Sequence, residues 1–306
     1  VADPQVVDRG RDQLDVRRPD QVARHVHLFG ARQHRHWLEP RDRRRDGGQV
    51  TAHLLDYPRL ECDFKEFKLS AEPGTIKVGE SVGVVGPNAI GKTTFVKMLA
   101  GIQEPTAGKV DKSVKVSYKP QYIAPDFDGS VMELFMVTNH EFFRSGFFES
   151  EIAHPLMLKR LYEKNVNTLS GGELQRVAIA ICLSREADMY LLDEPSAYLD
   201  SNQRMEAAKT VRRVMEKRGR SALIVDHDIY FLDMVSDSIM VFSGQPGKEG
   251  RANGPFDMRI GMNKFLREVD VTFRRDNDTN RPRINKPGSR LDREQKERGE
   301  YYYSDA

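Results

Sequence analysis

Residues 81–101 read SVGVVGPNAIGKTTFVKMLAG, and this stretch decides how the rest of the chain is interpreted. Five small or apolar residues, typical of a buried strand, precede an amphipathic segment that is typical of a helix. The residues between them, GPNAIGKT at 86–93, match the glycine-rich loop that binds phosphates when it joins a strand to a helix. Since both flanks fit, we expect a phosphate loop rather than an ordinary glycine-rich turn.

The chemistry of such a loop assigns a task to each residue type in it. Glycines let backbone N–H groups wrap an anion, and the N-terminus of the following helix favours negative charge. We expect Lys92 to reach the β- and γ-phosphates of ATP and Thr93 to ligate Mg²⁺ as the cofactor. The nucleotide-binding residues expected in the loop are Gly86, Asn88, Ala89, Gly91, Lys92, Thr93 and Thr94.

Around this loop, short apolar strands alternate with amphipathic helices over residues 48–244. That alternation is typical of an α/β domain with a largely parallel core sheet. A more helical stretch at about 125–185 indicates an inserted helical subdomain, and the Gly-, Pro- and Arg-rich residues 245–306 are interpreted as a tail. Other expected elements are strands at 189–194, 222–226 and 238–242 and helices at 173–183 and 201–218.

The composition changes sharply before this domain. Residues 1–47 contain eleven Arg, no Lys and the only Trp, and their apolar positions follow neither helix nor strand periodicity. A zinc site built from the four His of this segment would lack a thiolate or carboxylate framework, so we do not favour one. We expect a segment that is disordered or not native to the protein.

The bulk properties exclude several classes of protein. No apolar run approaches the roughly 20 residues of a membrane helix, and the first residues lack the apolar segment of a signal peptide. Cys62 and Cys182 are the only cysteines and have no metal-binding spacing, which fits a reducing compartment. The net charge of +2 gives no global attraction to nucleic acid or to a membrane. We therefore expect a cytoplasmic protein without a membrane partner.

A second motif, LLDE at 191–194, ends an apolar strand with two acids. Asp193 is expected to hold the Mg²⁺ shell, and Glu194 to accept a proton from the attacking water or to orient it. Many strands end in solvated charges, so the acid pair alone would not indicate a site. The phosphate loop upstream of it makes a catalytic role the favoured interpretation.

LSGGELQR at 169–176 resembles the signature motif of the ATP-binding-cassette superfamily. A Ser hydroxyl and Gly N–H groups at a helix N-terminus suit an anion. The resemblance implies that Ser170, Gly171, Gly172 and Glu173 act on the γ-phosphate of ATP held by a facing cassette.

The same resemblance implies further site residues. Gln121 is similar to the glutamine that senses Mg²⁺ and water, Asp200 closes a loop that contacts the opposite site, and His227 resembles the switch histidine at the γ-phosphate. Tyr57 is the candidate for stacking on adenine, with Phe64 and Phe67 as alternatives.

Longer strings resemble one branch, the ribosome-recycling family of archaea and eukaryotes, also called the RNase L inhibitor family. They include GPNAIGKTTFVKMLAG, LLDEPSAYLD and GMNKFLREVDVTFRRDNDTNRPRIN. The resemblance implies a second cassette plus a closing hinge, which drive the splitting of ribosomal subunits together with a first cassette. The implied partners are that first cassette or a second copy of this chain, the small ribosomal subunit with its rRNA, and proteins similar to release factors.

The chain also departs from that family. It has no second phosphate loop, and two isolated cysteines cannot hold the family's iron–sulfur clusters, so we expect no cluster in this chain. Asp226 stands where Glu is expected. Arg and Tyr residues in the tail suit contact with the phosphates and bases of RNA. Nearby acidic residues lower the local positive charge, so a brace between cassettes remains an alternative.

Two alternatives remain open. An ATPase subunit of a transporter would need a membrane partner and would not explain the long basic tail. A truncated, non-hydrolysing fragment would not explain why Lys92, Asp193, Glu194 and His227 are all present.

Overall fold

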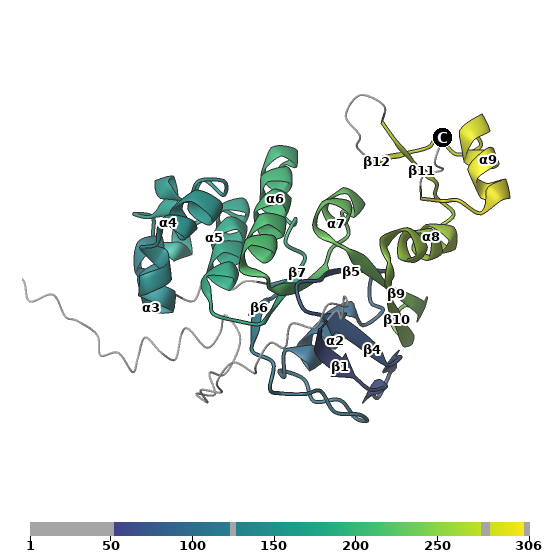
Figure 1. Cartoon of the computed structure of the whole chain (residues 1–306), viewed down its shortest axis with the longest axis horizontal. Helices are drawn as coiled ribbons and strands as arrows, with labels where there is room; N and C mark the ends of the chain where they lie inside the picture. Colours follow the sequence, from purple (N-terminus) through teal and green to yellow (C-terminus); the bar gives the residue numbers. More distant parts are fainter. Residues whose placement is uncertain (1–51, 123–126, 277–281, 303–306) are drawn as a thin grey trace, which may run out of the picture.

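The structure, a computed structural model, describes residues 52–122, 127–276 and 282–302 (Figure 1). The segment at 1–47, for which we expected no packed structure, lies outside the described residues. No helix in the described ranges is long and apolar enough to cross a membrane.

One mixed sheet forms the centre of the fold (Figure 1). Its strands, in chain order, are β2 (Leu60–Phe64), β3 (Phe67–Ala71), β5 (Ser81–Val85), β6 (Val116–Lys119), β7 (Met189–Asp193), β8 (Ser221–Val225), β9 (Ser238–Gln245) and β10 (Glu249–Asp257). Across the sheet they lie in the order β2-β3-β10-β9-β5-β8-β7-β6, and those from β9 to β6 run parallel. A separate two-stranded sheet pairs β1 (His53–Tyr57) with β4 (Gly74–Lys77).

The parallel strands are apolar on both faces, which is typical of a sheet covered on both sides. Every residue of β5, β7 and β8 is buried. Neighbouring residues of β7 enter different cores, with Leu191 on one side of the sheet and Tyr190 and Leu192 on the other. This pattern confirms the α/β fold with a largely parallel core sheet.

Helices cover the two faces unequally (Figure 1). One core packs α2 (Lys92–Leu99) and the small β1–β4 sheet against the main sheet. The other core packs four helices, which are α5 (Gly171–Ser184), α6 (Ser201–Arg218), α7 (Ile229–Val235) and α8 (Met258–Glu268). As expected, Phe95, Met98 and Leu99 share the buried face of α2.

A helical region lies beside α5 and is held by aromatic packing. It contains α3 (Val131–Phe143), α4 (Gly146–Phe148), a π-helical turn at Glu149–Ala153 and 3-10 turns at Lys159–Leu161 and Val166–Thr168. The ring of Phe135 stacks on Phe143 and meets Phe148 edge-on, with centroids 5.5 and 5.2 Å away. These helices fall within the range expected for the helical subdomain.

The expected end of the cassette at 244 is wrong. β10 begins after that point, yet it lies inside the main sheet, antiparallel to β9 and parallel to β3. The Gly and Pro residues within 249–257 are typical of an irregular tail. In fact Gly250 permits a close approach, since a Cβ there would lie 2.1 Å from the carbonyl oxygen of Ile90 in the phosphate loop.

The residues after α8 form a compact unit built from β11 (Phe273–Arg275), β12 (Pro282–Ile284) and α9 (Arg290–Arg298). A buried network holds it together: Thr272 donates to Asp292, Asn285 donates to Thr272 and Gln295, and Gln295 donates to the carbonyl of Phe273. Tyr302 donates a hydrogen bond to Asp233, which joins this unit to α7.

Several of the tail cations noted in the sequence have partners within the chain. Arg274 donates to Asn285, Arg275 lies 3.7 Å from Asp233, and Arg283 lies 2.9 Å from Asp276. These contacts hold that part of the tail against other residues of the same chain. Arg281 and Tyr303 lie outside the described residues.

Candidate functional site

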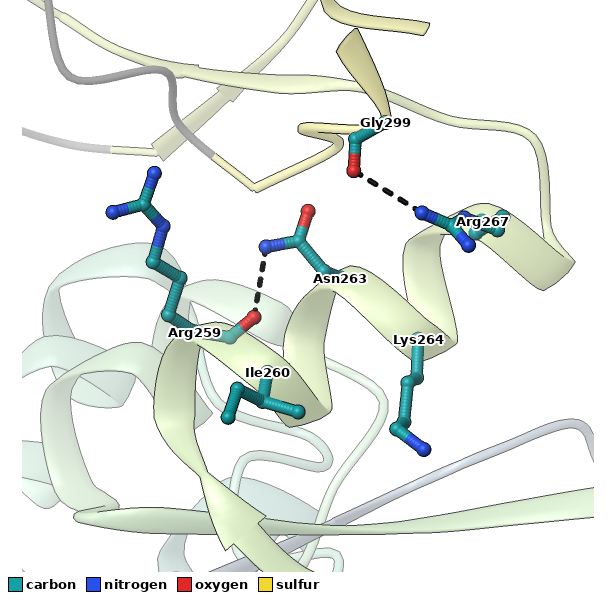
Figure 2. A pocket seen from close by; sticks show the side chains of 6 residues that line it. All are labelled: Arg259, Ile260, Asn263, Lys264, Arg267 and Gly299. Carbon is teal, nitrogen blue, oxygen red and sulfur yellow. Dashed lines mark hydrogen bonds between the residues drawn. The ribbon is translucent and has the colours of Figure 1, made fainter.

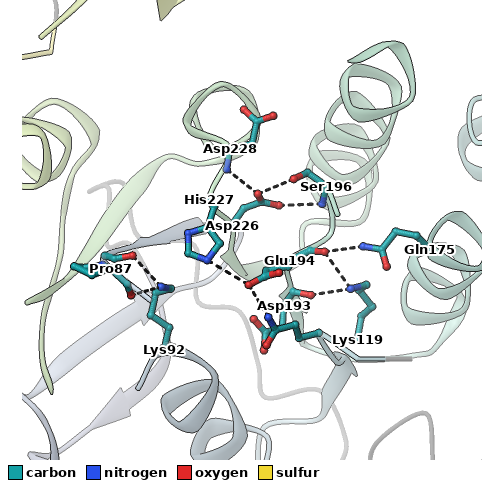
Figure 3. A network of polar contacts seen from close by, with 12 residues as sticks. Pro87, Lys92, Lys119, Gln175, Asp193, Glu194, Ser196, Asp226, His227 and Asp228 are labelled. Atoms are coloured by element: carbon teal, nitrogen blue, oxygen red, sulfur yellow. Dashed lines mark hydrogen bonds and ion pairs between the residues drawn. The ribbon is translucent and has the colours of Figure 1, made fainter. Parts of the chain in front are cut away.

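The carboxyl ends of β5, β6, β7 and β8 meet at one edge of the sheet, because these strands run parallel (Figure 3). The phosphate loop follows β5, Gln121 follows β6, the acid pair follows β7, and His227 follows β8. Motifs that are far apart in the sequence therefore lie around one centre.

The phosphate loop has a backbone that few residue types adopt. Gly86 and Gly91 have φ values of 147° and 93°, and Ala89 also has a positive φ of 56°. A Cβ at Gly86 would lie 2.5 Å from the carbonyl oxygen of Phe242, so only glycine fits there. Gly91 precedes α2 without a side-chain cap, which leaves the first N–H groups of the helix available to an anion.

Lys92 lies inside this loop. Its side chain is almost fully buried, and Nζ donates to the carbonyl oxygens of Gly86 and Pro87 at 2.8 and 2.6 Å. Burial lowers the pKa of Lys92, while Glu194 and Asp193 oppose that shift. The ammonium group is thus held within the loop that is expected to bind phosphate.

Asp193 ends β7 and is 0% exposed. Within the described residues, neither of its carboxylate oxygens has a well-formed hydrogen bond. Burial raises the pKa of Asp193, and the Thr93 hydroxyl, Lys119 and Lys92 offset this only in part. A buried carboxylate beside a threonine hydroxyl is a donor set of hard oxygens that suits Mg²⁺.

The expected catalytic side chains converge on Glu194, and Figure 3 shows His227 beside it. Its Oε1 accepts a hydrogen bond from Gln121 Nε2 at 2.8 Å and lies 3.3 Å from His227 Nε2. Its own backbone is left-handed, with a φ of 49°. Gln121 and His227, from the ends of two other strands, therefore meet at the Glu194 carboxylate.

Asp226, which stands where Glu is expected, organises the neighbouring loop. Its buried carboxylate accepts from Ser196 N and Oγ at 2.9 and 2.7 Å and from Asp228 N at 2.8 Å. Burial raises its pKa, and these three donors act against that shift. Asp226 thereby joins the segment around His227 to the loop at 196–200, a role that a single sequence could not reveal.

The four signature residues lie at the start of α5. Ser170 is the N-cap, and it exchanges hydrogen bonds with Glu173 in a capping box. The ion pair and hydrogen bond with Lys164, at 2.8 Å, hold the pKa of Glu173 down to about 2, with help from Ser170.

Gly171 and Gly172 pack against the loop at 196–200. A Cβ at Gly172 would lie 2.8 Å from the carbonyl oxygen of Tyr198, and one at Gly171 would lie 3.4 Å from its ring. At the end of the same loop, Asp200 caps α6 by accepting from Gln203 N at 2.8 Å. The signature residues and this loop thus form one surface beside the acid pair.

The interpretation of Tyr57 as the adenine-stacking ring is contradicted. Tyr57 is 3% exposed, its ring meets Phe95 edge-on at 5.6 Å, and its hydroxyl donates to the carbonyl of Gly254. It belongs to the core under the small sheet and has no free face for a base. By contrast, the ring of Phe67 lies against Gly91, with ring atoms 3.0 to 3.1 Å from the position of a Cβ there.

Comparison with known proteins identifies close similarity over most of the chain. A family model described as ABC transporter matches residues 73–197. An uncharacterised ABC transporter ATP-binding protein of Methanocaldococcus jannaschii is 53% identical over 82% of this chain and 42% of its own length. Translation initiation factor RLI1 of Saccharomyces cerevisiae is 42% identical over 83% of this chain and 42% of its own length. The chain therefore spans less than half the length of these two relatives.

A shorter relative is matched almost end to end. ABC transporter E family member 3 of Arabidopsis thaliana is 37% identical over 54% of this chain and 94% of its own length.

Solved structures agree with these relatives. An RNase-L inhibitor is similar with a TM-score of 0.81 and 56% identity, over 83% of this chain and 49% of that one. An archaeal ribosome recycling factor, solved in complex with the ribosomal stalk protein aP1, also has a TM-score of 0.81, with 54% identity over 86% of this chain and 51% of that one.

Proposed function

The chain belongs to the E family of ATP-binding-cassette ATPases, and on that premise we propose that it binds and hydrolyses Mg-ATP as one cassette of a twin-cassette ribosome-recycling protein. The observation that carries this proposal is the convergence of Gln121 and His227 on the carboxylate of Glu194, beside the buried Asp193. The full recycling activity belongs to the longer relatives, so this chain would supply one part of it, in the cytoplasm.

Each residue of this group has a distinct task in the proposed reaction. Glu194 accepts a proton from the attacking water, while Gln121 and His227 fix the direction of its carboxylate. Lys92 and the N-terminus of α2 bind the phosphates. Thr93 and Asp193 would hold Mg²⁺, which neutralises charge on the phosphate oxygens when it is bound.

Phe64 is the aromatic residue proposed to stack on adenine. It ends β2, is 40% exposed, and pairs in register with Phe67, which lies against the phosphate loop. An exposed ring at the edge of the loop can offer a face to a base, whereas a buried ring cannot.

The other half of the proposed mechanism requires a second cassette. Ser170 and Gly172 stand at a helix N-terminus and would face the γ-phosphate of ATP bound by the partner. That partner is the first cassette of the longer protein or a second copy of this chain.

A basic hollow on α8 is the proposed contact for the phosphates of rRNA in the small ribosomal subunit (Figure 2). The hollow has a volume of about 320 Å³ and is lined by Arg259, Ile260, Asn263, Lys264, Arg267 and Gly299. The Lys264 ammonium lies 4.3 Å from the ring centre of Phe256, Arg267 donates to the carbonyl of Gly299, and Arg259 lies 3.6 Å from the Glu300 carboxylate. Each of the three cations is therefore held by a contact within the chain. Fixed cations in a hollow suit a phosphate backbone.

Two measurements test these parts separately. Steady-state phosphate release by the full chain, with and without a separately produced first cassette, should rise when that cassette is added and fall to background in Glu194→Gln. Co-sedimentation with small ribosomal subunits should weaken in Lys264→Ala but not in the exposed control Lys112→Ala. Release that is equal in wild type and Glu194→Gln would overturn the catalytic assignment.

A further inference from the structure

The backbone of Glu194 has a conformation that needs outside support. Its φ of 49° lies in the left-handed region, which is unfavourable for a residue with a side chain. Its N–H donates to the carbonyl of Val225 at 2.7 Å, so one side of the peptide is already fixed by β8. What remains to be held is the carbonyl group that follows.

Two fully buried side chains bind that carbonyl. Gln175, from α5, donates through Nε2 to the carbonyl oxygen of Glu194 at 2.6 Å. Lys119, the last residue of β6, donates through Nζ to the same oxygen at 3.3 Å. Figure 3 shows both side chains reaching the backbone at Glu194.

Lys119 uses its whole ammonium group on backbone carbonyls. Besides Glu194, it donates to the carbonyl oxygens of Asp193 at 2.7 Å and of Pro120 at 3.0 Å. The side chain is 1% exposed, and burial lowers its pKa to about 8, against the effect of Asp193 and other nearby groups. Since burying an ammonium is costly, an apolar residue would fill this space more easily unless the three bonds are needed.

We propose that Lys119 and Gln175 are positioning residues for hydrolysis: they hold the backbone of Glu194 in its left-handed conformation and so aim its carboxylate. This inference rests on the proposed function, in which Glu194 acts on the attacking water. Without the two donors the peptide after Glu194 can rotate, and its carboxylate then leaves Gln121 and His227. A displacement of about 1 Å at a reacting group costs on the order of 100-fold in rate.

The test uses the full chain with Lys119→Met and, separately, Gln175→Met. Each substitution keeps a long unbranched side chain but removes the donors. At saturating ATP and with the second cassette present, the rate of phosphate release should fall about 100-fold in each, as expected for a displaced catalytic group. The dissociation constant of a fluorescent ATP analogue should stay within about threefold of wild type, because Lys92 and the loop are unchanged.

Controls separate this inference from the proposed function. Lys112→Met, at a lysine whose side chain is 71% exposed, should change neither quantity. In single-turnover measurements, adding Lys119→Met to Glu194→Gln should cause no further loss of rate, because both act through the same carboxylate.

The outcomes are distinct. If Glu194→Gln abolishes release while Lys119→Met and Gln175→Met keep the wild-type rate, the positioning role is wrong and the proposed function stands. A parallel loss of binding and turnover in Gln175→Met would also overturn it, since that residue would then support the fold instead of the direction of Glu194. Wild-type turnover in Glu194→Gln would overturn the proposed function itself.

Discussion

Replacing Asp193 by Asn is expected to stabilise the chain and to remove its response to Mg-ATP. Asp193 is fully buried, and within the described residues its carboxylate oxygens have no well-formed hydrogen bond. Burial raises its pKa, and the Thr93 hydroxyl and the ammonium groups of Lys119 and Lys92 do not fully offset this. The ionised carboxylate therefore opposes folding of the protein without nucleotide.

The sign follows from proton linkage. The folded chain keeps a proton on Asp193 more readily than the unfolded chain, so stability falls as the pH rises from 3.8 through the folded-state pKa. Above that pKa the whole penalty is present. An unsatisfied buried polar group costs about 1–3 kcal/mol. Asn removes the charge but keeps a polar amide, so we expect a gain of about 1 kcal/mol, or about 2–4 °C in melting temperature.

Thermal unfolding at pH 8 with and without Mg-ATP measures this effect. Nucleotide at 100 times its dissociation constant should stabilise the wild type by about 2.7 kcal/mol and the Asp193→Asn chain much less, so the order of the melting temperatures reverses. Asp63→Asn, at a half-exposed surface carboxylate paired with Lys68, is the control that should change neither value. The reasoning is refuted if Asp193→Asn melts below the wild type without nucleotide, or if Mg-ATP raises both melting temperatures equally.

Three further outcomes are expected. Lys92→Ala should abolish tight binding of a fluorescent ATP analogue, whereas Glu194→Gln should bind it and barely hydrolyse ATP; equal loss of binding in both would contradict their separate roles. Turnover per chain should rise with protein concentration, and Ser170→Arg should remove that rise while sparing ATP binding, so a fast, concentration-independent rate from a monomer would refute a site shared between cassettes. Deleting residues 1–47 should change the melting temperature by less than about 4 °C, and a larger drop would show that the segment packs against the domain.

Local sequence patterns were sufficient for most elements of the core. The helix expected at 201–218 is α6, and the strands expected beside the phosphate loop, the acid pair and His227 are β5, β7 and β8. These elements have strong periodicity and are bounded by motifs, and each can be recognised without knowledge of its neighbours.

Features that depend on distant neighbours were missed. Tyr57 has the residue type of a base-stacking ring, but only the packing of Phe95 shows that it is buried. The Gly and Pro residues of β10 predict an irregular tail, because nothing in that segment itself reveals that β3 and β9 lie on either side of it. A lysine at the end of a strand is expected to be exposed to solvent. Lys119 is buried instead, because its ammonium group donates to the backbone carbonyls of Asp193 and Glu194.

The position of β10 in the sheet has a consequence for synthesis of the chain. β3 pairs with β10, and Lys68 and its partner Glu249 are separated by roughly 180 residues. At about 5–20 residues per second, β3 waits roughly 10–40 s after translation before its partner strand is made. During that interval the N-terminal hairpin exposes an unpaired edge, the kind of edge that recruits other chains. The edge of β3 therefore stays open to pairing with other chains until residue 257 has left the ribosome.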